Sequence, residues 1–162
     1  MASWLIVCDS CCEIRTLENP APGVQFEVVP FKIRVANREF SDTSMLNVPE
    51  MMAAMDNYNG ASTSACPSPE EFAQAYLKAD NVICMTISQN LSGSYNAACV
   101  ARDMVLEEYP EKRIAVVDLL SCGGELAATA WKINEWIAEG VEFSEIVERA
   151  HEYGKETHLM FL

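Results

Sequence analysis

Three short apolar runs that alternate with helical stretches restrict the fold of this chain more than any other feature. The runs occupy residues 4–8, 81–88 and 113–118, and each ends at or just before a polar residue. This pattern is typical of strands buried on both faces of a sheet. Helices are predicted at 69–79, 94–109 and 125–138. Strands that alternate with helices predict an α/β fold, namely a three-layer α/β/α domain with a mainly parallel sheet.

Four other segments carry weaker signals. Residues 26–40 form an extended stretch with a turn near Asn37, which predicts a hairpin or an edge ribbon. A short helix is predicted at 45–55 with Pro49 in its first turn, and Ser144 is the predicted N-cap of a helix at 145–153. The chain ends in THLMFL, an apolar β-like run, and a domain seldom finishes by starting a strand. We therefore expect a truncated chain.

The charge and the cysteines limit the environment and the partners. The 162 residues hold 11 Lys plus Arg against 24 Asp plus Glu, a net charge of −13, which disfavours binding to nucleic acid and electrostatic docking to membranes. The first apolar run ends by Asp9, too early for a signal peptide, and no run is long enough to span a bilayer. Seven cysteines, an odd number, leave at least one thiol unpaired but do not alone assign a compartment. Because neither a signal peptide nor a membrane span is expected, we predict a cytoplasmic protein with reduced thiols and no stable membrane insertion.

Polar residues follow the predicted strands at their carboxyl ends, where open parallel sheets bind ligands. Asp9 and Ser10 follow the first strand, and Ser92, Gly93 and Ser94 open the helix after the second. Amides at a helix start, with nearby hydroxyls, can hold a carboxylate or phosphate without lysine or arginine. The alternative is that Ser92 only caps its own helix.

A second polar segment precedes the helix that starts near Pro69. It contains several hydroxyls and one thiol: Ser62, Thr63, Ser64 and Cys66. These hydroxyls exceed what one helix cap requires, although an ordinary loop with Ser68 as the cap is the simpler interpretation. Asp118 and Ser121 complete the same predicted edge of the sheet.

Metal and nucleophile chemistry are weakly supported. Cys8 and Cys11 form a C-x-x-C, but Cys8 lies inside an apolar run, whereas redox motifs expose their first cysteine at a helix start. Only His151 and His158 remain as other ligands, so neither a metal nor a cofactor is predicted. The same shortage of bases weakens an alternative function, a hydrolase or acyltransferase with Ser92 or Cys66 as nucleophile. A second alternative is an interaction module whose acidic surface binds a basic partner.

The polar segments together resemble the bacterial DegV family. The resemblance is carried by residues 9–10, 64–69, 87–88, 91–95, 118 and 121, in the family's order. It implies a protein that binds one long-chain fatty acid and presents it to an ATP-dependent fatty acid kinase, which makes an acyl phosphate for phospholipid synthesis. It therefore implies a carrier rather than an enzyme.

The resemblance also assigns individual residues. Ser64 takes the position of the family's headgroup-binding threonine, while Ala65 replaces a serine, whose hydrogen bond is then either lost or supplied by Ser62 or Thr63. Ser92 matches the serine of the Leu-Ser-Gly-Thr-Tyr element, and Gly93 allows close backbone approach. Carboxylate binding is thus expected from Ser64, Ser92 and Gly93. The expected supporting residues are Asp9, Ser10, Thr63, Cys66 and Ser94.

The resemblance covers one lobe of a two-lobed fold. Residues 1–162 correspond to the N-terminal α/β lobe, and the C-terminal lobe, which supplies further headgroup contacts, is expected to be absent. We therefore predict weak or no retention of fatty acid by this chain alone.

Overall fold

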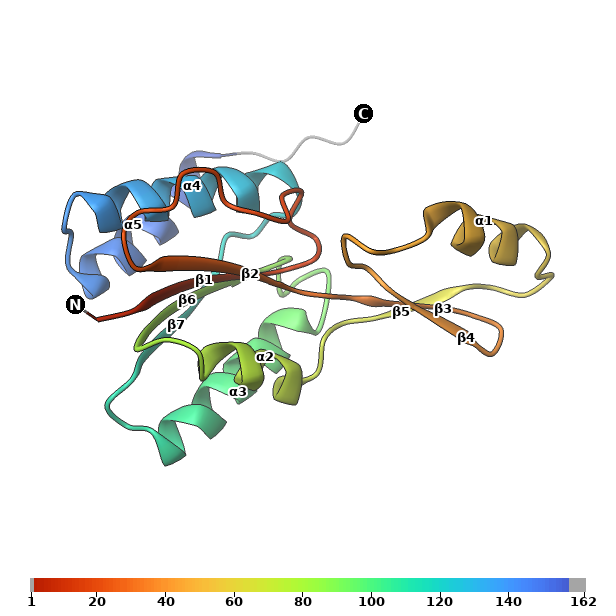
Figure 1. Ribbon diagram of the computed structural model, residues 1–162, viewed down its shortest axis with the longest axis horizontal. Coiled ribbons are helices and arrows are strands. Elements are labelled where there is room, and N and C mark those ends of the chain that lie inside the picture. Colours follow the sequence, from red (N-terminus) through yellow and green to blue (C-terminus); the bar gives the residue numbers. More distant parts are fainter. Residues whose placement is uncertain (1, 158–162) are drawn as a thin grey trace.

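The computed structural model describes residues 2–157, in which a parallel four-stranded sheet forms the centre of the main domain (Figure 1). The strand order is β2-β1-β6-β7. The strands are β1 (Trp4–Asp9), β2 (Val24–Val29), β6 (Asn81–Thr86) and β7 (Arg113–Asp118). The flanking helices are α2 (Pro69–Tyr76), α3 (Ser94–Glu108), α4 (Gly124–Ala138) and α5 (Phe143–Glu156). The predicted α/β/α fold with a parallel sheet is confirmed.

Alternate residues of the central strands feed two hydrophobic cores. Leu5 and Val82 pack with Phe72 and other residues of α2 and α3 on one face. Ile6 and Ile83 pack with residues of α4 and α5 on the other face. All six residues of β6 are buried, as expected for a strand covered by helices on both sides.

The starts of α2 and α3 agree with the predictions, α4 begins one residue earlier than predicted, at Gly124, and the start of α5 differs. Ser68 caps α2 in a capping box with Glu71, and α3 begins at Ser94. The predicted cap at Ser144 is wrong, because α5 begins one residue earlier, at Phe143, with Glu142 as its N-cap. The Phe143 ring packs against Trp4 with ring centroids 5.9 Å apart. This tertiary contact draws Phe143 into the first turn of the helix.

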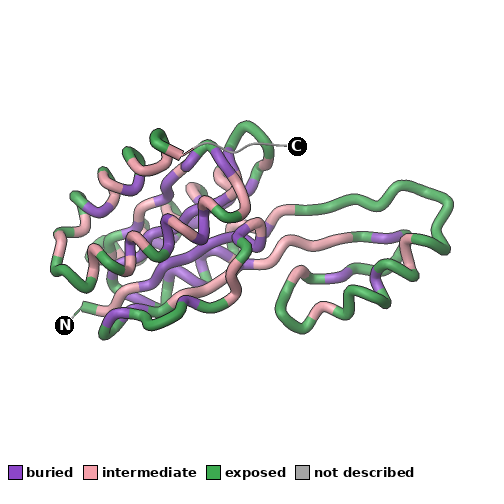
Figure 2. The backbone as a smooth tube through the Cα atoms, turned by 90° about the horizontal axis from the view of Figure 1, so that it is seen from above, coloured by how far each residue is buried: buried purple, intermediate pink, exposed green. Residues whose placement is uncertain are grey.

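Residues 31–66, here called the arm, project from the main domain as a separate small unit (Figure 1). The arm comprises β3 (Lys32–Val35), β4 (Arg38–Ser41), α1 (Val48–Asp56) and β5 (Thr63–Ala65), with its own antiparallel sheet in the order β4-β3-β5. Its buried cluster is Val35, Phe40 and Met51, separate from both cores. Figure 2 shows only short buried stretches in the arm, in contrast to the central layer.

The predicted hairpin at 26–40 is only partly correct. The turn near Asn37 is present, and Ala36 adopts a φ of 54° there. However, the residues before Pro30 belong to β2, which pairs in parallel with β1 at the edge of the central sheet. The first part of this extended stretch thus belongs to the central sheet and the rest to the sheet of the arm. Local sequence patterns do not reveal this division.

Two further predictions concern α1 and the end of the chain. The short helix begins at Val48, later than expected, because Asn47 caps it by accepting a 3.2 Å hydrogen bond from the Glu50 N–H. Pro49 lies in its first turn, as predicted. Most of the predicted terminal strand, residues 158–162, lies outside the described residues. Within 2–157, no helix is long and apolar enough to cross a bilayer.

Candidate functional site

The carboxylate of Asp9 joins three elements at the carboxyl edge of the central sheet. Asp9 ends β1 and is fully buried. Its Oδ2 accepts hydrogen bonds from Ser94 Oγ at 2.6 Å and from the Ile87 N–H at 3.0 Å, while Oδ1 accepts from the Cys11 N–H at 3.2 Å. Because chain connections leave β1 and β6 in opposite directions across the sheet, this is the topological switch point, where such folds bind ligands.

Burial raises the pKa of Asp9 above its ordinary value of 3.8, although the three donors oppose that shift. All the hydrogen bonds of the carboxylate are made within the protein, from Ser94, Ile87 and Cys11. Asp9 and Ser94 therefore hold the β6–α3 loop in place. Both residues were expected to support the site.

Ser92 and Gly93 lie on this supported loop. Gly93 is the N-cap residue of α3, which has no side-chain cap and no acidic residue in its first turn. Ser92 Oγ accepts a 3.2 Å hydrogen bond from the Ser94 N–H, so it satisfies one amide of the helix start. Within residues 2–157 its own O–H has no acceptor, so it remains available to donate to an anion. Capping alone therefore leaves the hydrogen-bond donor of this hydroxyl unused.

The second polar segment lies against this loop. A Cβ placed on Gly93 would lie 3.7 Å from Cys66 Sγ, so the segment after β5 contacts the start of α3. Ser64 precedes Cys66 by two residues on β5, and both Ser64 and Thr63 are exposed. The fold thus brings Cys66, Gly93 and Ser92 together and places Ser64 at the near end of the arm.

Ser10, one of the expected supporting residues, lies at the base of the arm. It is buried, and its Oγ accepts a 2.9 Å hydrogen bond from the Phe31 N–H at the base of the arm. Ser10 N–H also donates to the Val29 carbonyl at 3.0 Å. Ser10 therefore anchors the arm to β1.

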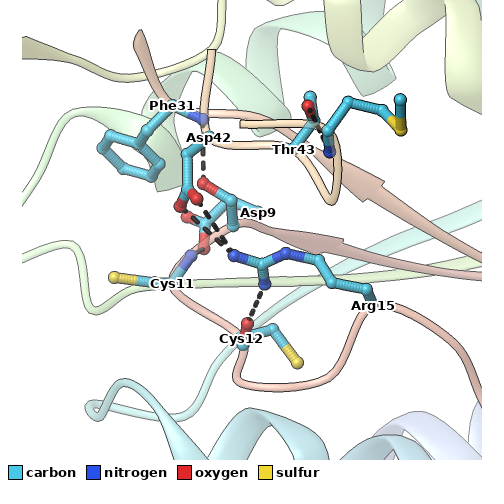
Figure 3. Close-up of polar contacts among 9 residues, drawn as sticks. Asp9, Cys11, Cys12, Arg15, Phe31, Asp42 and Thr43 are labelled. Carbon is cyan, nitrogen blue, oxygen red and sulfur yellow. Dashed lines mark hydrogen bonds and ion pairs between the residues drawn. The ribbon is translucent and has the colours of Figure 1, made fainter. Parts of the chain in front are cut away.

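Two ion pairs at the base of the arm were not anticipated from the sequence. Arg15 Nη2 lies 3.2 Å from Asp42, while Nη1 donates to the Cys12 carbonyl (Figure 3). Lys32 Nζ lies 2.7 Å from Glu71 Oε1. The partners are far apart in the sequence, so no local pattern could have indicated these pairs.

A further pair of polar groups lies at the end of β7. Asp118 Oδ2 and Ser121 Oγ are buried and have no hydrogen-bond partner among the described residues. Ser121 is joined to the β6–α3 loop by its carbonyl, which accepts from the Ser88 N–H at 2.9 Å. The predicted edge of Asp9, Ser92 and Ser121 therefore does form one continuous rim.

The arrangement gives little support to nucleophilic or metal chemistry. In residues 2–157, neither Ser92 nor Cys66 hydrogen-bonds a histidine or a carboxylate, and His151 is exposed on α5. No group of three or more His, Cys, Asp or Glu side chains in that part of the chain is placed to hold a metal ion. Cys8 is fully buried and hydrogen-bonds Cys12 rather than Cys11, which raises the pKa of Cys8. The C-x-x-C pair is thus not arranged as a redox centre.

Sequence comparisons find close relatives. The model of the DegV family matches residues 3–162. A DegV domain-containing protein of Streptococcus gordonii is 42% identical over 160 residues, covering 99% of this chain and 57% of the relative. A second relative, from Streptococcus pyogenes serotype M1, is 41% identical over 160 residues, with the same coverage. The chain therefore spans little more than half the length of these relatives.

Solved structures resemble the fold closely. The Streptococcus pneumoniae fatty acid kinase (Fak) B3 protein loaded with linoleic acid has a TM-score of 0.90 and 40% identity, with 94% of this chain and 54% of that chain covered. A DegV family protein from Eubacterium eligens loaded with heptadecanoic acid has a TM-score of 0.87 and 31% identity, with the same coverage. A third, from Ruminococcus gnavus with vaccenic acid, has a TM-score of 0.86 and 31% identity, covering 96% of this chain and 56% of that chain.

Proposed function

The chain belongs to the DegV family, and from this membership we propose that it binds one long-chain fatty acid through the acid's carboxylate. The observation that carries the proposal is the start of α3, where Ser92 has a free donor and no acidic side chain competes for the helix amides. The fatty acids present in the structures of relatives support the same ligand class.

The proposed headgroup site combines the loop before α3 with the near end of the arm. Ser92 and Ser64 donate from their hydroxyls, and the backbone around Gly93 approaches the carboxylate without a side chain in the way. Thr63 and Cys66 flank the site. Hydroxyl and amide donors hold a carboxylate without a cation, which suits a chain whose net charge is −13.

Apolar surface borders the site on the side of β7. Leu91 and Leu120 are 60% and 63% exposed, respectively. Both line an open hollow of about 590 Å³, whose other lining residues include the serines Ser88 and Ser121 and the charged Glu125 and Lys155. Each methylene buried from water contributes roughly 0.8 kcal/mol, so an acyl chain gains most of its affinity from such surface and the headgroup contacts orient it.

The finer parts of the proposal concern the whole protein. We propose that residues 1–162 act as one lobe, that a second lobe completes the headgroup site and covers the acyl chain, and that the protein is a carrier and not an enzyme. It would present the acid to an ATP-dependent fatty acid kinase in the cytoplasm. The exposed position of Ser64 supports a site that needs a second wall.

Mass spectrometry of co-purified lipid tests the proposal. We expect stoichiometric long-chain fatty acid in a longer protein that spans the full length of the relatives, and little in residues 1–162. Ser92→Ala should reduce the bound acid, whereas Ser44→Ala, an exposed serine elsewhere on the arm, should not. Equal stoichiometric acid in both lengths would refute the two-lobe account, and absence of acid from both would refute fatty acid binding.

A further inference from the structure

The arm and the main domain are two bodies joined at a narrow base. The arm has its own sheet and its own buried cluster, Val35, Phe40 and Met51, which shares no residue with the two cores. The chain crosses between the two bodies twice, once between β2 and β3 and once between β5 and α2. Because no common hydrophobic core fixes the orientation of the arm, the contacts at its base must do so.

The basal ion pairs, Arg15–Asp42 and Lys32–Glu71, are the most buried ion pairs in the described part of the chain. Their side chains are 32% and 30% exposed in the first pair and 31% and 32% in the second. Every other ion pair within residues 2–157 has at least one side chain that is 49% exposed or more. Ion pairs shielded from solvent are screened less than exposed ones, so these two contribute most to orientation.

The two ion pairs connect the base of the arm to elements on opposite faces of the central sheet. Arg15 lies in the β1–β2 loop, whose Leu17 packs in the core beneath α4 and α5. Glu71 belongs to α2, on the other face, and also closes the capping box of that helix by accepting from the Ser68 N–H at 2.8 Å. On the arm, Lys32 lies opposite Ser41 in the β3–β4 register, and Ser41 directly precedes Asp42. Both ion pairs therefore contact the same end of the arm sheet.

The proposed headgroup site lies at this same end of the arm sheet. Lys32 pairs with Ala65 and Ile33 with Ser64 in the arm sheet, whereas Ser92 is held to the main domain through Asp9 and Ser94. Any rotation of the arm therefore moves Ser64 relative to Ser92. The two hydroxyls of the proposed site belong to different bodies.

We propose that Arg15 and Lys32 are positioning residues, which set the separation of Ser64 and Ser92 by clasping the base of the arm to Asp42 and Glu71. We call these two ion pairs the clasp. The effect of the clasp on ligand binding rests on the proposed function, whereas its effect on the orientation of the arm needs no ligand.

Distances between two spin labels test the clasp without ligand. The labels are attached through a non-natural amino acid at Met45 on the arm and Gln74 on α2, both of which are exposed. We expect a narrow distance distribution that broadens or shifts in Arg15→Gln, in Lys32→Gln and in 1 M salt. Arg34→Gln, which removes an exposed pair within the arm, is the matched control and should not change it. An unchanged distribution in both clasp variants would overturn the proposal.

The same variants, made in the longer protein that spans the full length of the relatives, are then titrated with linoleic acid. A half-buried ion pair is worth about 1 kcal/mol, so Arg15→Gln should weaken binding about fivefold. The exchanged pair Arg15→Asp with Asp42→Arg should restore distance and affinity in part, since it re-forms the ion pair but not the hydrogen bond from Arg15 to the Cys12 carbonyl. A changed distance with unchanged affinity would overturn the positioning role. Failure of the unaltered protein to bind the acid would count against the proposed function, while the distances would still decide on the clasp.

Discussion

Asp9 Oδ2 accepts a 2.6 Å hydrogen bond from Ser94 Oγ, and both residues are fully buried. This contact joins the end of β1 to the start of α3 across the two central strands. The same oxygen accepts from the Ile87 N–H, so one carboxylate determines where the loop that carries Ser92 leaves the sheet.

Asp9→Asn should lower the free energy of unfolding by about 3 kcal/mol. The side-chain amide of asparagine replaces one acceptor oxygen with an NH2 group, which then faces a group that is itself a donor. At least one buried donor is left without an acceptor. Urea unfolding at pH 7 measures the loss. Asp56→Asn, an exposed aspartate at the end of α1, is the control and should leave stability within about 0.5 kcal/mol.

The raised pKa of Asp9 predicts a pH dependence of stability. Below the ordinary value of 3.8 the carboxyl is protonated in both the folded and the unfolded state. Between that value and the raised folded pKa, only the folded state holds the proton. The contribution of this group to the free energy of unfolding is therefore fully present below 3.8 and is lost as the pH rises through the folded pKa.

Ser94→Ala should extend this window upward, because it removes the donor that most lowers the pKa of Asp9. The destabilisation should be about 2 kcal/mol at pH 7 and smaller at pH 4, where Asp9 is more fully protonated. Unfolding curves across that range compare the variant with Ser144→Ala, an exposed serine of α5. A pH-independent difference would contradict the assignment.

Removal of either proposed headgroup hydroxyl should weaken fatty acid binding. Ser64→Ala and Ser92→Ala should each reduce affinity about tenfold to a hundredfold, since each removes one hydrogen bond to a charged group. Ser64→Thr keeps the hydroxyl and should bind as the unaltered protein does. Calorimetric titration in a full-length protein measures this effect. If Ser64→Thr binds as poorly as Ser64→Ala, the hydroxyl is not the contact.

Thr129→Val should stabilise the protein. Thr129 is fully buried in α4, and its Oγ1 has no hydrogen-bond partner among residues 2–157. An isosteric methyl group removes the desolvation penalty of that hydroxyl, so we expect a gain of about 1 kcal/mol in urea unfolding. Thr16→Val, at an exposed position, should give no gain.

Phe40→Ala should unfold the arm without unfolding the main domain. Phe40 lies in the cluster of Val35 and Met51, which is separate from both cores. Loss of a large buried side chain typically costs about 3 to 5 kcal/mol, more than so small a cluster supplies. Hydrogen exchange should show lost protection in 31–66 and unchanged protection in β1 and β6. Loss of protection throughout the chain would mean that the arm and the core unfold together.

The local patterns of the sequence were sufficient for the main domain. The apolar runs at β1, β6 and β7 are continuous because helices cover these strands on both faces, and the signals at Ser68 and Pro69 mark the start of α2 through short-range hydrogen bonds. The rim of polar residues at the carboxyl ends also followed from the strand direction, which is common to all parallel sheets.

What only the tertiary structure decided is the separation of the chain into two bodies and the contacts between them. Both β2 and β3 alternate apolar and polar residues, and only the pairing of β2 with β1 assigns β2 to the central sheet. Ser10 and Ser92 are equivalent as isolated serines, yet one accepts from Phe31 at the base of the arm and the other keeps a free donor beside Gly93. Local patterns determine strands, helices and caps, because those depend on neighbouring residues. Pairings such as Arg15 with Asp42 depend on loops brought together by the sheet, so only the folded chain defines them.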